Sequence, residues 1–446
     1  MTLPAPRAVA RGAIEHPPAS LPSALRRIGP GIVLASAIVG SGEVIATTTL
    51  GAQVGYSALW IVLVSCAIKP VVQAELGRYT IVTGHTGLEG FMRVPGPRLG
   101  AGWLVYAWAA TVMLTLLQVG GMYGGVGQVL NAVWPALSVN AWVAVCLAIT
   151  LAVLLGGGYA RIERFAVFKV ALFTLITVFA AAVLLRRGAV TAADVRTGLS
   201  FAIPVSGLAT AIAVFGITGV GATELAMYPY WCVEKGYARF VGPREAGPEW
   251  IARARGWIRV MHLDITCSLA IYTAATVAFY LLGAGVLHRM GVVPAARDTV
   301  AVLSNIYTET LGRWALPVFY LGVVVTLYGT IFAATAAHSR MFADLAQILG
   351  AYDRDDDGSR RRWRQRFVVV LATLPAIFYW FFASPVKMVV AGGIAQAMML
   401  PLIGGAAIYL RHAALPRELQ PSVLTTVVLW GSTAVMALFA VYYLLG

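Results

Sequence analysis

Charge is what this sequence has least of. Only 12% of its 446 residues are Asp, Glu, Lys or Arg, and the stretch from Leu99 to Ala160 contains none of these and no His. Soluble domains carry about 25% charged residues, so the composition excludes an ordinary soluble protein. Hydrophobic residues make up 59% of the chain and the mean hydropathy is +0.79. We therefore expect a polytopic membrane protein.

Cysteine is also scarce, and the familiar motifs of enzymes and leader peptides are missing. The four cysteines, none in a CxxC pair, predict neither a disulfide framework nor a zinc site; they are Cys66, Cys146, Cys232 and Cys267. No glycine-rich segment has the strand and helix context of a phosphate-binding loop, so we expect no enzyme and no cofactor. Residues 1–28 lack a short apolar core with a cleavage site, which indicates a cytoplasmic tail and no signal peptide.

Long apolar runs fill the rest of the chain. A membrane-spanning helix needs about 20 predominantly apolar residues, and the sequence offers eleven such spans. They are expected near 31–54, 57–80, 102–131, 140–158, 165–186, 202–233, 257–286, 312–342, 367–383, 386–410 and 423–445. The first prediction of fold class is thus an all-α bundle of eleven transmembrane helices.

Basic residues predict the orientation of the bundle. Lys and Arg stay on the cytoplasmic side, and they gather before the first span and after each even-numbered span, most densely in the run Arg360, Arg361, Arg362, Arg364 and Arg366. We therefore expect an integral plasma (inner) membrane protein with a cytoplasmic N-terminus and an external C-terminus. The net charge of +14 then reflects topology and contact with membrane lipid, with no nucleic-acid partner.

One pattern, Val-Gly-x-x-Glu, occurs twice inside apolar spans, at Val39–Glu43 and at Val220–Glu224. Carboxylates are rare and costly at membrane depth, and glycine loosens a helix. The two copies lie on spans one and six, as expected for inverted repeats over 29–187 and 200–411, with 420–446 as an additional helix. Broken helices at equivalent positions of such repeats indicate a substrate site at the bilayer midplane. The alternative is that the glycines pack helices and the glutamates are hydrogen-bonded core residues.

Several segments together resemble the Nramp (natural resistance-associated macrophage protein) family of divalent-metal transporters. They are Gly29–Gly31, Leu50–Tyr56, Leu59–Trp60, Val82–Gly84, Gly221–Thr223, Arg259 with Asp264, and Gln396–Pro401. The resemblance implies a LeuT fold of eleven helices, with helices one and six unwound at their centres, and alternating access between the two membrane faces.

The departures from that family fall on the metal site. Where the family has Asp-Pro-Gly-Asn, this chain has Gly40–Glu43, and the Met-Pro-His motif of helix six is replaced by Leu225–Met227. Loss of the soft thioether favours a hard divalent cation, magnesium or manganese, as the transported substrate. Metal ligands are expected from Glu43, Glu224, Gln396, Gly40 and Gly221, with Gly40, Gly42 and Gly221 unwinding the helices. Possible secondary residues are Met227, Tyr228, Lys69, Gln118 and Asp264.

Two other functions use the same residues. An organic cation or another small organic molecule could pair with one glutamate inside an aromatic cluster of Tyr123, Tyr228, Tyr230 and Trp231. A non-transporting membrane receptor is the third hypothesis. Lys69 has two alternative roles: it is either a counter-charge to one of the glutamates or an ion-pair partner of Glu75. His338 is expected to extend its side chain to the membrane surface.

Overall fold

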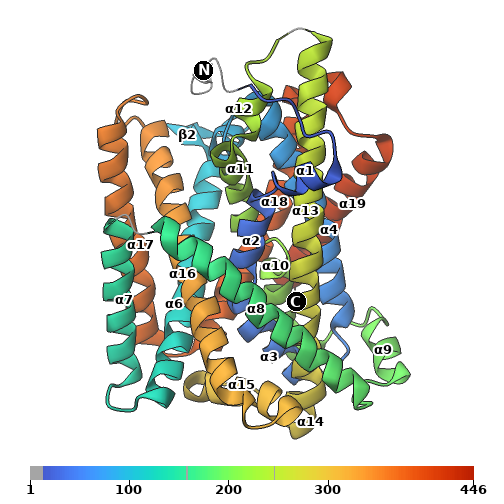
Figure 1. Cartoon of the computed structure of the whole chain (residues 1–446), viewed down its shortest axis with the longest axis vertical. Coiled ribbons are helices and arrows are strands. Elements are labelled where there is room, and N and C mark those ends of the chain that lie inside the picture. Colours follow the sequence, from blue (N-terminus) through green and yellow to red (C-terminus); the bar gives the residue numbers. More distant parts are fainter. Residues whose placement is uncertain (1–13, 157–158, 246, 446) are drawn as a thin grey trace.

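A helix forms at each of the eleven predicted spans. The computed structural model describes residues 14–156, 159–245 and 247–445, and its long helices run between two ends of one bundle (Figure 1). In chain order they are α2 (Pro30–Ile38) with η1 (Gly42–Thr47) and α3 (Thr48–Val54), α4 (Leu59–Thr83), α6 (Trp103–Val133), α7 (Val139–Leu155), α8 (Tyr159–Arg186), α10 (Leu208–Ile217) with α11 (Ala222–Lys235), α13 (Pro248–Leu282), α16 (Ala315–Ile348), α17 (Asp357–Phe382), α18 (Pro385–Ala414) and α19 (Val423–Leu445).

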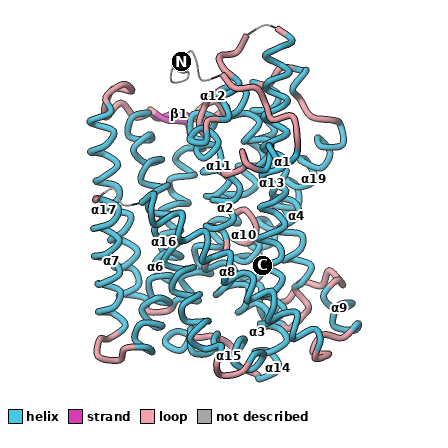
Figure 2. Tube along the Cα trace, viewed as in Figure 1, coloured by secondary structure: helices cyan, strands magenta, loops and turns pink. Residues whose placement is uncertain are grey.

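Short elements connect the long helices at the two ends of the bundle. Figure 2 shows most loops at these ends, and one loop in the interior beside α10. The short helices are α1 (Leu21–Leu25), α5 (Gly87–Phe91), α9 (Ala192–Gly198), α12 (Tyr237–Val241), α14 (His288–Met290) and α15 (Thr299–Leu311), joined by single turns η2 (Val205–Gly207), η3 (Gly283–Leu287), η4 (Ala296–Asp298) and η5 (Arg417–Leu419). Two strands of two residues each, β1 (Arg98–Leu99) and β2 (Ala101–Gly102), pair antiparallel.

Spans one and six are broken in the middle. In span one, α2 ends at Ile38 and the π-helical turn η1 begins at Gly42, with a bend of 42° between the two halves. In span six, α10 ends at Ile217 and α11 begins at Ala222, so that four residues leave the helix. Gly219 lies in this break with φ of +64°, a conformation that favours glycine. The unwinding that the resemblance implied is confirmed at both positions.

Helix length and composition support fewer membrane crossings than the eleven predicted from sequence. Among the described residues, eight helices are long and apolar enough to cross a bilayer, and the broken first span makes a ninth. The helix α7 is shorter than this, and of α8 this count covers only Ala171–Arg186. Eleven crossings therefore stay a prediction, and so do the boundaries of the inverted repeats and of the N-terminal tail.

Small residues let three helices approach closely around the breaks. The helix α18 packs against both α6 and α10. A Cβ atom on Gly216 of α10 would lie 2.1 Å from the carbonyl oxygen of Gly393 in α18, so the two backbones are in direct contact. Glycine permits such contact between membrane helices, where van der Waals packing supplies the attraction. The contact brings Gln396, one turn further along α18, to the break in span six.

Candidate functional site

A small polar cavity lies where the two broken spans meet α6, α16 and α18. Its volume is about 30 Å³, which is the space of about one water molecule. Five segments contribute its polar lining. The polar residues are Ser41, Thr115, Gln118, Thr223, Glu224, Thr330, His338 and Gln396. The cavity therefore fits a water molecule or a largely dehydrated ion.

Five of these residues form one hydrogen-bonded chain across the cavity. Gln118 Nε2 donates to Ser41 Oγ at 3.1 Å, and Gln396 Nε2 donates to Gln118 Oε1 at 3.0 Å. The backbone N–H of Thr223 donates to Gln396 Oε1 at 3.2 Å, and Thr223 Oγ1 donates to Glu224 Oε2 at 2.9 Å. The chain joins span one, α6, α18 and span six. Each amide is oriented by its neighbours, as a preorganised site requires.

Glu224 is the carboxylate of the cavity. It occupies the first turn of α11, where the free backbone N–H groups and the helix dipole favour negative charge, and its side chain is partly exposed. Gly221 precedes it, and a Cβ atom there would lie 2.4 Å from both Gln396 Oε1 and Glu224 Oε2. Only glycine therefore lets both oxygens approach the break.

Glu43 lies beside the cavity and does not line it. Its side chain is fully buried; Oε2 accepts a hydrogen bond from the Gly40 N–H at 3.1 Å, and Oε1 accepts one from Thr276 Oγ1 at 3.2 Å. A Cβ atom on Gly40 would lie 2.7 Å from Thr330 Oγ1, so the break in span one is tightly packed. Glu43 is close enough to Glu224 for their charges to interact. The structure thus brings the two acids near each other but points only one into the cavity.

Lys69 of α4 holds the end of α10 at the second break. Its ammonium group is fully buried and donates to the carbonyl oxygens of Phe215 and Thr218 at 2.5 and 2.7 Å. A cation is stabilised at a helix C-terminus, where carbonyl groups lack partners. Glu75 pairs instead with Arg78 at 3.4 Å and with Arg411 at 3.8 Å. Of the two alternatives for Lys69, pairing with Glu75 is therefore wrong. Lys69 caps α10, and its charge lies near both Glu43 and Glu224.

Asp264 and Tyr228 hold the start of span one rather than the cavity. Asp264 on α13 accepts the backbone N–H of Gly29 at 2.9 Å and of Gly31 at 2.5 Å, which are orphan donors at the first turn of α2. Tyr228 Oη donates to the same carboxylate at 3.3 Å. Met227 is buried in the core and is not among the lining residues. These three possible secondary residues thus lie outside the cavity.

Sequence reasoning missed the contribution of α16. Thr330, Ala334 and His338 are four residues apart, lie on one face of α16, and all line the cavity. His338 is only 5% exposed, so the expectation that it extends to the membrane surface is wrong. The spacing of four along an apolar span is the signal that could have found this face. Ser41 and Thr223 were also missed, although each stands inside a Val-Gly-x-x-Glu motif.

The cavity offers oxygen donors, one imidazole and the thioether of Met122, and it lacks a classical cluster of acids. Within the part of the chain that the structure describes, no three His, Cys, Asp or Glu side chains gather as a metal site would need. A divalent ion there would depend on Glu224 together with neutral oxygens of Gln396, Thr223 and the unwound backbone. Hard cations accept carboxylate, amide and carbonyl oxygens as ligands. The donor set is therefore chemically suited to such an ion.

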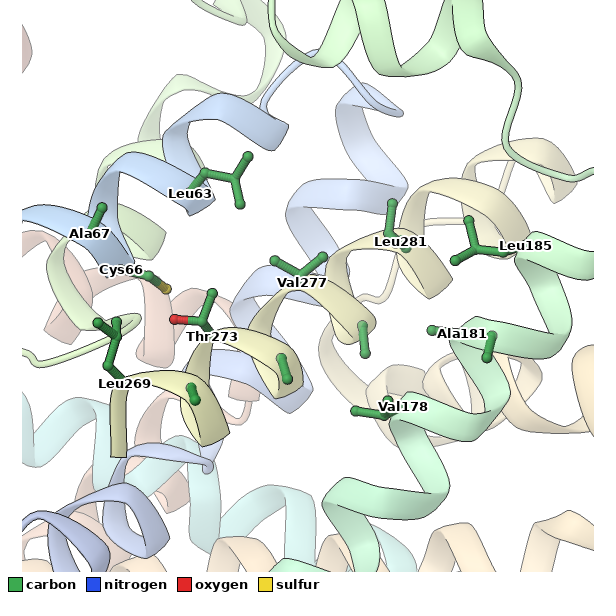
Figure 3. A pocket seen from close by; sticks show the side chains of 14 residues that line it. Leu63, Cys66, Ala67, Val178, Ala181, Leu185, Leu269, Thr273, Val277 and Leu281 are labelled. Carbon is green, nitrogen blue, oxygen red and sulfur yellow. The ribbon is translucent and has the colours of Figure 1, made fainter. Parts of the chain in front are cut away.

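A larger crevice elsewhere in the bundle has no such chemistry. It has a volume of about 850 Å³ and lies between α4, α8 and α13, where apolar side chains such as Leu63, Val178 and Leu281 face one another (Figure 3). Only Cys66 and Thr273 bring polar atoms to it. A crevice lined in this way offers almost no polar ligands to an ion.

Two broken spans that meet at a polar cavity define the class of LeuT-fold membrane proteins, and comparison with solved structures agrees. The chain resembles the manganese transporter of Eremococcus coleocola, crystallised with an aromatic bis-isothiourea compound, with a TM-score of 0.60 and 13% identity over 97% of this chain and 90% of that one. It also resembles Mhp1, a nucleobase-cation-symport-1 family transporter, with a TM-score of 0.55 and 15% identity over 93% and 89% of the two chains. At these identities the likeness is one of fold.

The family follows from sequence. Residues 31–446 match the family of natural resistance-associated macrophage protein-like (Nramp) proteins, and the chain belongs to this family. An uncharacterized protein of Pasteurella multocida is 24% identical over 329 residues, 72% of this chain and 71% of that protein. The protein is therefore an integral, multi-pass membrane protein of a transporter family and not an enzyme.

Proposed function

We propose that the protein is a secondary transporter that moves a hard divalent cation, magnesium or manganese, by alternating access through the cavity between its two broken spans. The observation that carries the proposal is the convergence of Glu224, Gln396 and Thr223 oxygens on a space of about 30 Å³. Family membership supports the transporter class, and the similarity in fold to the manganese transporter of Eremococcus coleocola makes manganese one substrate to test.

In the proposed mechanism, the ion enters with part of its water shell and exchanges water for protein oxygens. Glu224 supplies the negative charge, and Gln396 supplies an amide oxygen fixed by its bond to Gln118. The half-helix α10 ends at the site and α11 begins there. Small rotations of either half therefore open the site to one side of the membrane or the other. Glu43 and Lys69 hold the two breaks in shape through Gly40 and the end of α10.

The size of the cavity favours an ion over an organic substrate. Sites for organic ligands have volumes of about 300–1,000 Å³, an order of magnitude more than this one. None of the four aromatic side chains expected around an organic cation lines the cavity. Two of them form hydrogen bonds elsewhere: Tyr123 donates to Thr150 on α7, and Tyr228 donates to Asp264 on α13. No observation favours the receptor hypothesis.

For orientation, we propose that the end of the bundle carrying α1, α12 and the two short strands faces the cytoplasm. Figure 1 shows α1, α12 and β2 in the upper part of the bundle. Arg27 follows α1, Arg98 lies in β1 and Arg239 lies in α12, in keeping with the rule that basic residues stay inside. Glycosylation or cysteine-labelling tags on the loop 134–138 and on the N-terminus test this assignment.

The proposed function is tested by uptake into proteoliposomes. We expect Glu224→Gln to reduce Mn²⁺ and Mg²⁺ uptake to the level of empty vesicles, because the cavity loses its one lining carboxylate. Glu249→Gln is the matched control, since Glu249 also lies in the first turn of a long helix, α13, but is exposed. Uptake by Glu224→Gln at the wild-type rate, or no cation uptake by the wild type, would contradict the proposal.

A further inference from the structure

Oxygen atoms gather around the Lys69 ammonium group at the C-terminal end of α10. Lys69 Nζ donates to the carbonyl oxygens of Phe215 and Thr218 at 2.5 and 2.7 Å. One turn earlier on the same face of α4, Ser65 Oγ lies 3.2 and 3.1 Å from these two carbonyl oxygens and 3.0 Å from Thr218 Oγ1. The break in span six and α4 thus form one compact cluster of two carbonyl and two hydroxyl oxygens.

The hydrogen-bond partners of this buried ammonium group are neutral. Arg78 and Arg411, which are also buried, both contact the carboxylate of Glu75, at 3.4 and 3.8 Å. Lys69 forms no such ion pair with any residue that the structure describes, and its Nζ lies 5.2 Å from the centre of the Phe215 ring, which also favours a cation. Carbonyl oxygens surround a dehydrated monovalent ion in a similar way.

The place of the ammonium group in the fold is one that free ions take in other proteins. In transporters with broken helices, carbonyl groups of the unwound segments and the C-terminal ends of half-helices coordinate a coupling cation. Here α4 lies directly against the break, because a Cβ atom on Gly219 would lie 3.1 Å from Cα of Cys66. The side chain of Lys69 therefore reaches the end of α10 from a helix packed beside it. Its charge also interacts with Glu43 and Glu224.

We propose that the oxygen cluster is a monovalent-cation site that this chain fills with its own Lys69, so that its cycle needs no sodium or potassium ion at this position. The ammonium group supplies the single positive charge of such an ion. A free ion can leave with the substrate, whereas Lys69 is tethered to α4 and stays. This inference goes beyond the proposed function, because the cluster lies beside the cavity and its filling does not depend on which ion the cavity takes.

The test measures the midpoint of thermal unfolding of the purified full chain in equal concentrations of sodium, potassium, methylammonium or tetramethylammonium chloride. Lys69→Ala empties the space of the ammonium group. We expect its midpoint to be higher by at least about 2 °C in one or more of the first three salts than in tetramethylammonium chloride, whose cation has no N–H group and is too large for the cluster. The wild type and Lys387→Ala, at an exposed lysine of α18, should each have the same midpoint in all four salts.

Lys69→Met is the second variant, because its side chain fills much of the same space without a charge. We expect it to lose stability and to gain no response to these cations. Three results would each overturn the inference: an equal midpoint of Lys69→Ala in all four salts, failure of that variant to fold in any of them, or an equally large response of Lys69→Met. A higher midpoint of the wild type in sodium or potassium chloride would overturn it as well. None of these outcomes bears on the transport of divalent cations, which uptake into proteoliposomes tests separately.

Discussion

At the scale of single residues, the site is made by glycines as much as by acids. Gly221 permits two oxygens to share a space that a methyl group would fill, and Gly40 permits Thr330 to pack against the other break. The two acids differ in role: Glu224 lines the cavity, whereas the Glu43 carboxylate accepts a hydrogen bond from the Gly40 N–H. The two copies of one sequence motif therefore differ in role: the copy in span one supports the break, and we propose that the copy in span six coordinates the cation.

Gly221→Ala tests the role of this glycine. The added Cβ would lie 2.4 Å from Gln396 Oε1 and Glu224 Oε2, so at least one oxygen must move. We expect Mn²⁺ affinity to fall by about tenfold or more, measured by calorimetry. Gly405→Ala in α18 is the control, because its Cβ would meet nothing within 4 Å; equal affinities in the two variants would contradict the assignment.

At the scale of elements, polar side chains of one helix cap the broken ends of another. Lys69 of α4 caps the C-terminal end of α10, and Asp264 of α13 caps the N-terminal end of α2. In lipid no water can satisfy these backbone groups, so the half-helices depend on such partners. Gly31 permits this capping contact, because a Cβ atom there would lie 2.7 Å from the carbonyl oxygen of Asp264 and would keep α2 and α13 apart.

Asp264→Ala tests this capping. The variant leaves the N–H groups of Gly29 and Gly31 without their acceptor, and we expect a loss of stability of about 1–3 kcal/mol, seen as a lower midpoint of thermal unfolding in detergent. Asp298→Ala is the control, since Asp298 stands at the N-cap of α15 without a capping side-chain bond. An unchanged midpoint for Asp264→Ala would show that another group caps α2.

The positions of the helices and of the two breaks were largely predictable from sequence. The hydrogen-bond partners that side chains find across the site were not. Long apolar runs predict membrane helices because the bilayer leaves few other structures possible, and glycines beside carboxylates marked both breaks. The pairing of Gln118 with Gln396 depends on how α6 meets α18, which periodicity does not encode. For the same reason the direction in which Glu43 points, the capping by Lys69 and the cavity face of α16 required the three-dimensional arrangement.

At the scale of the whole molecule, ion pairs join the helices at the end of the bundle proposed to be cytoplasmic. Glu234 pairs with Arg340, Glu89 with Arg354, and Asp344 with Arg360, at 2.8, 2.8 and 3.0 Å. They tie α11, α5, α16 and α17 together around a polar cavity of about 210 Å³. Partly exposed pairs contribute about 0.2–1 kcal/mol each, which suits contacts that must break whenever this end of the bundle opens.

The central claim is that one divalent cation binds between the broken spans. The most direct test is anomalous X-ray diffraction from crystals of the protein grown with Mn²⁺. The account predicts a single strong anomalous peak bounded by Glu224, Gln396 and the face of α16 that carries His338, and no such peak in Glu224→Gln crystals. Manganese bound only at other positions, with this cavity empty at saturating Mn²⁺, would contradict it.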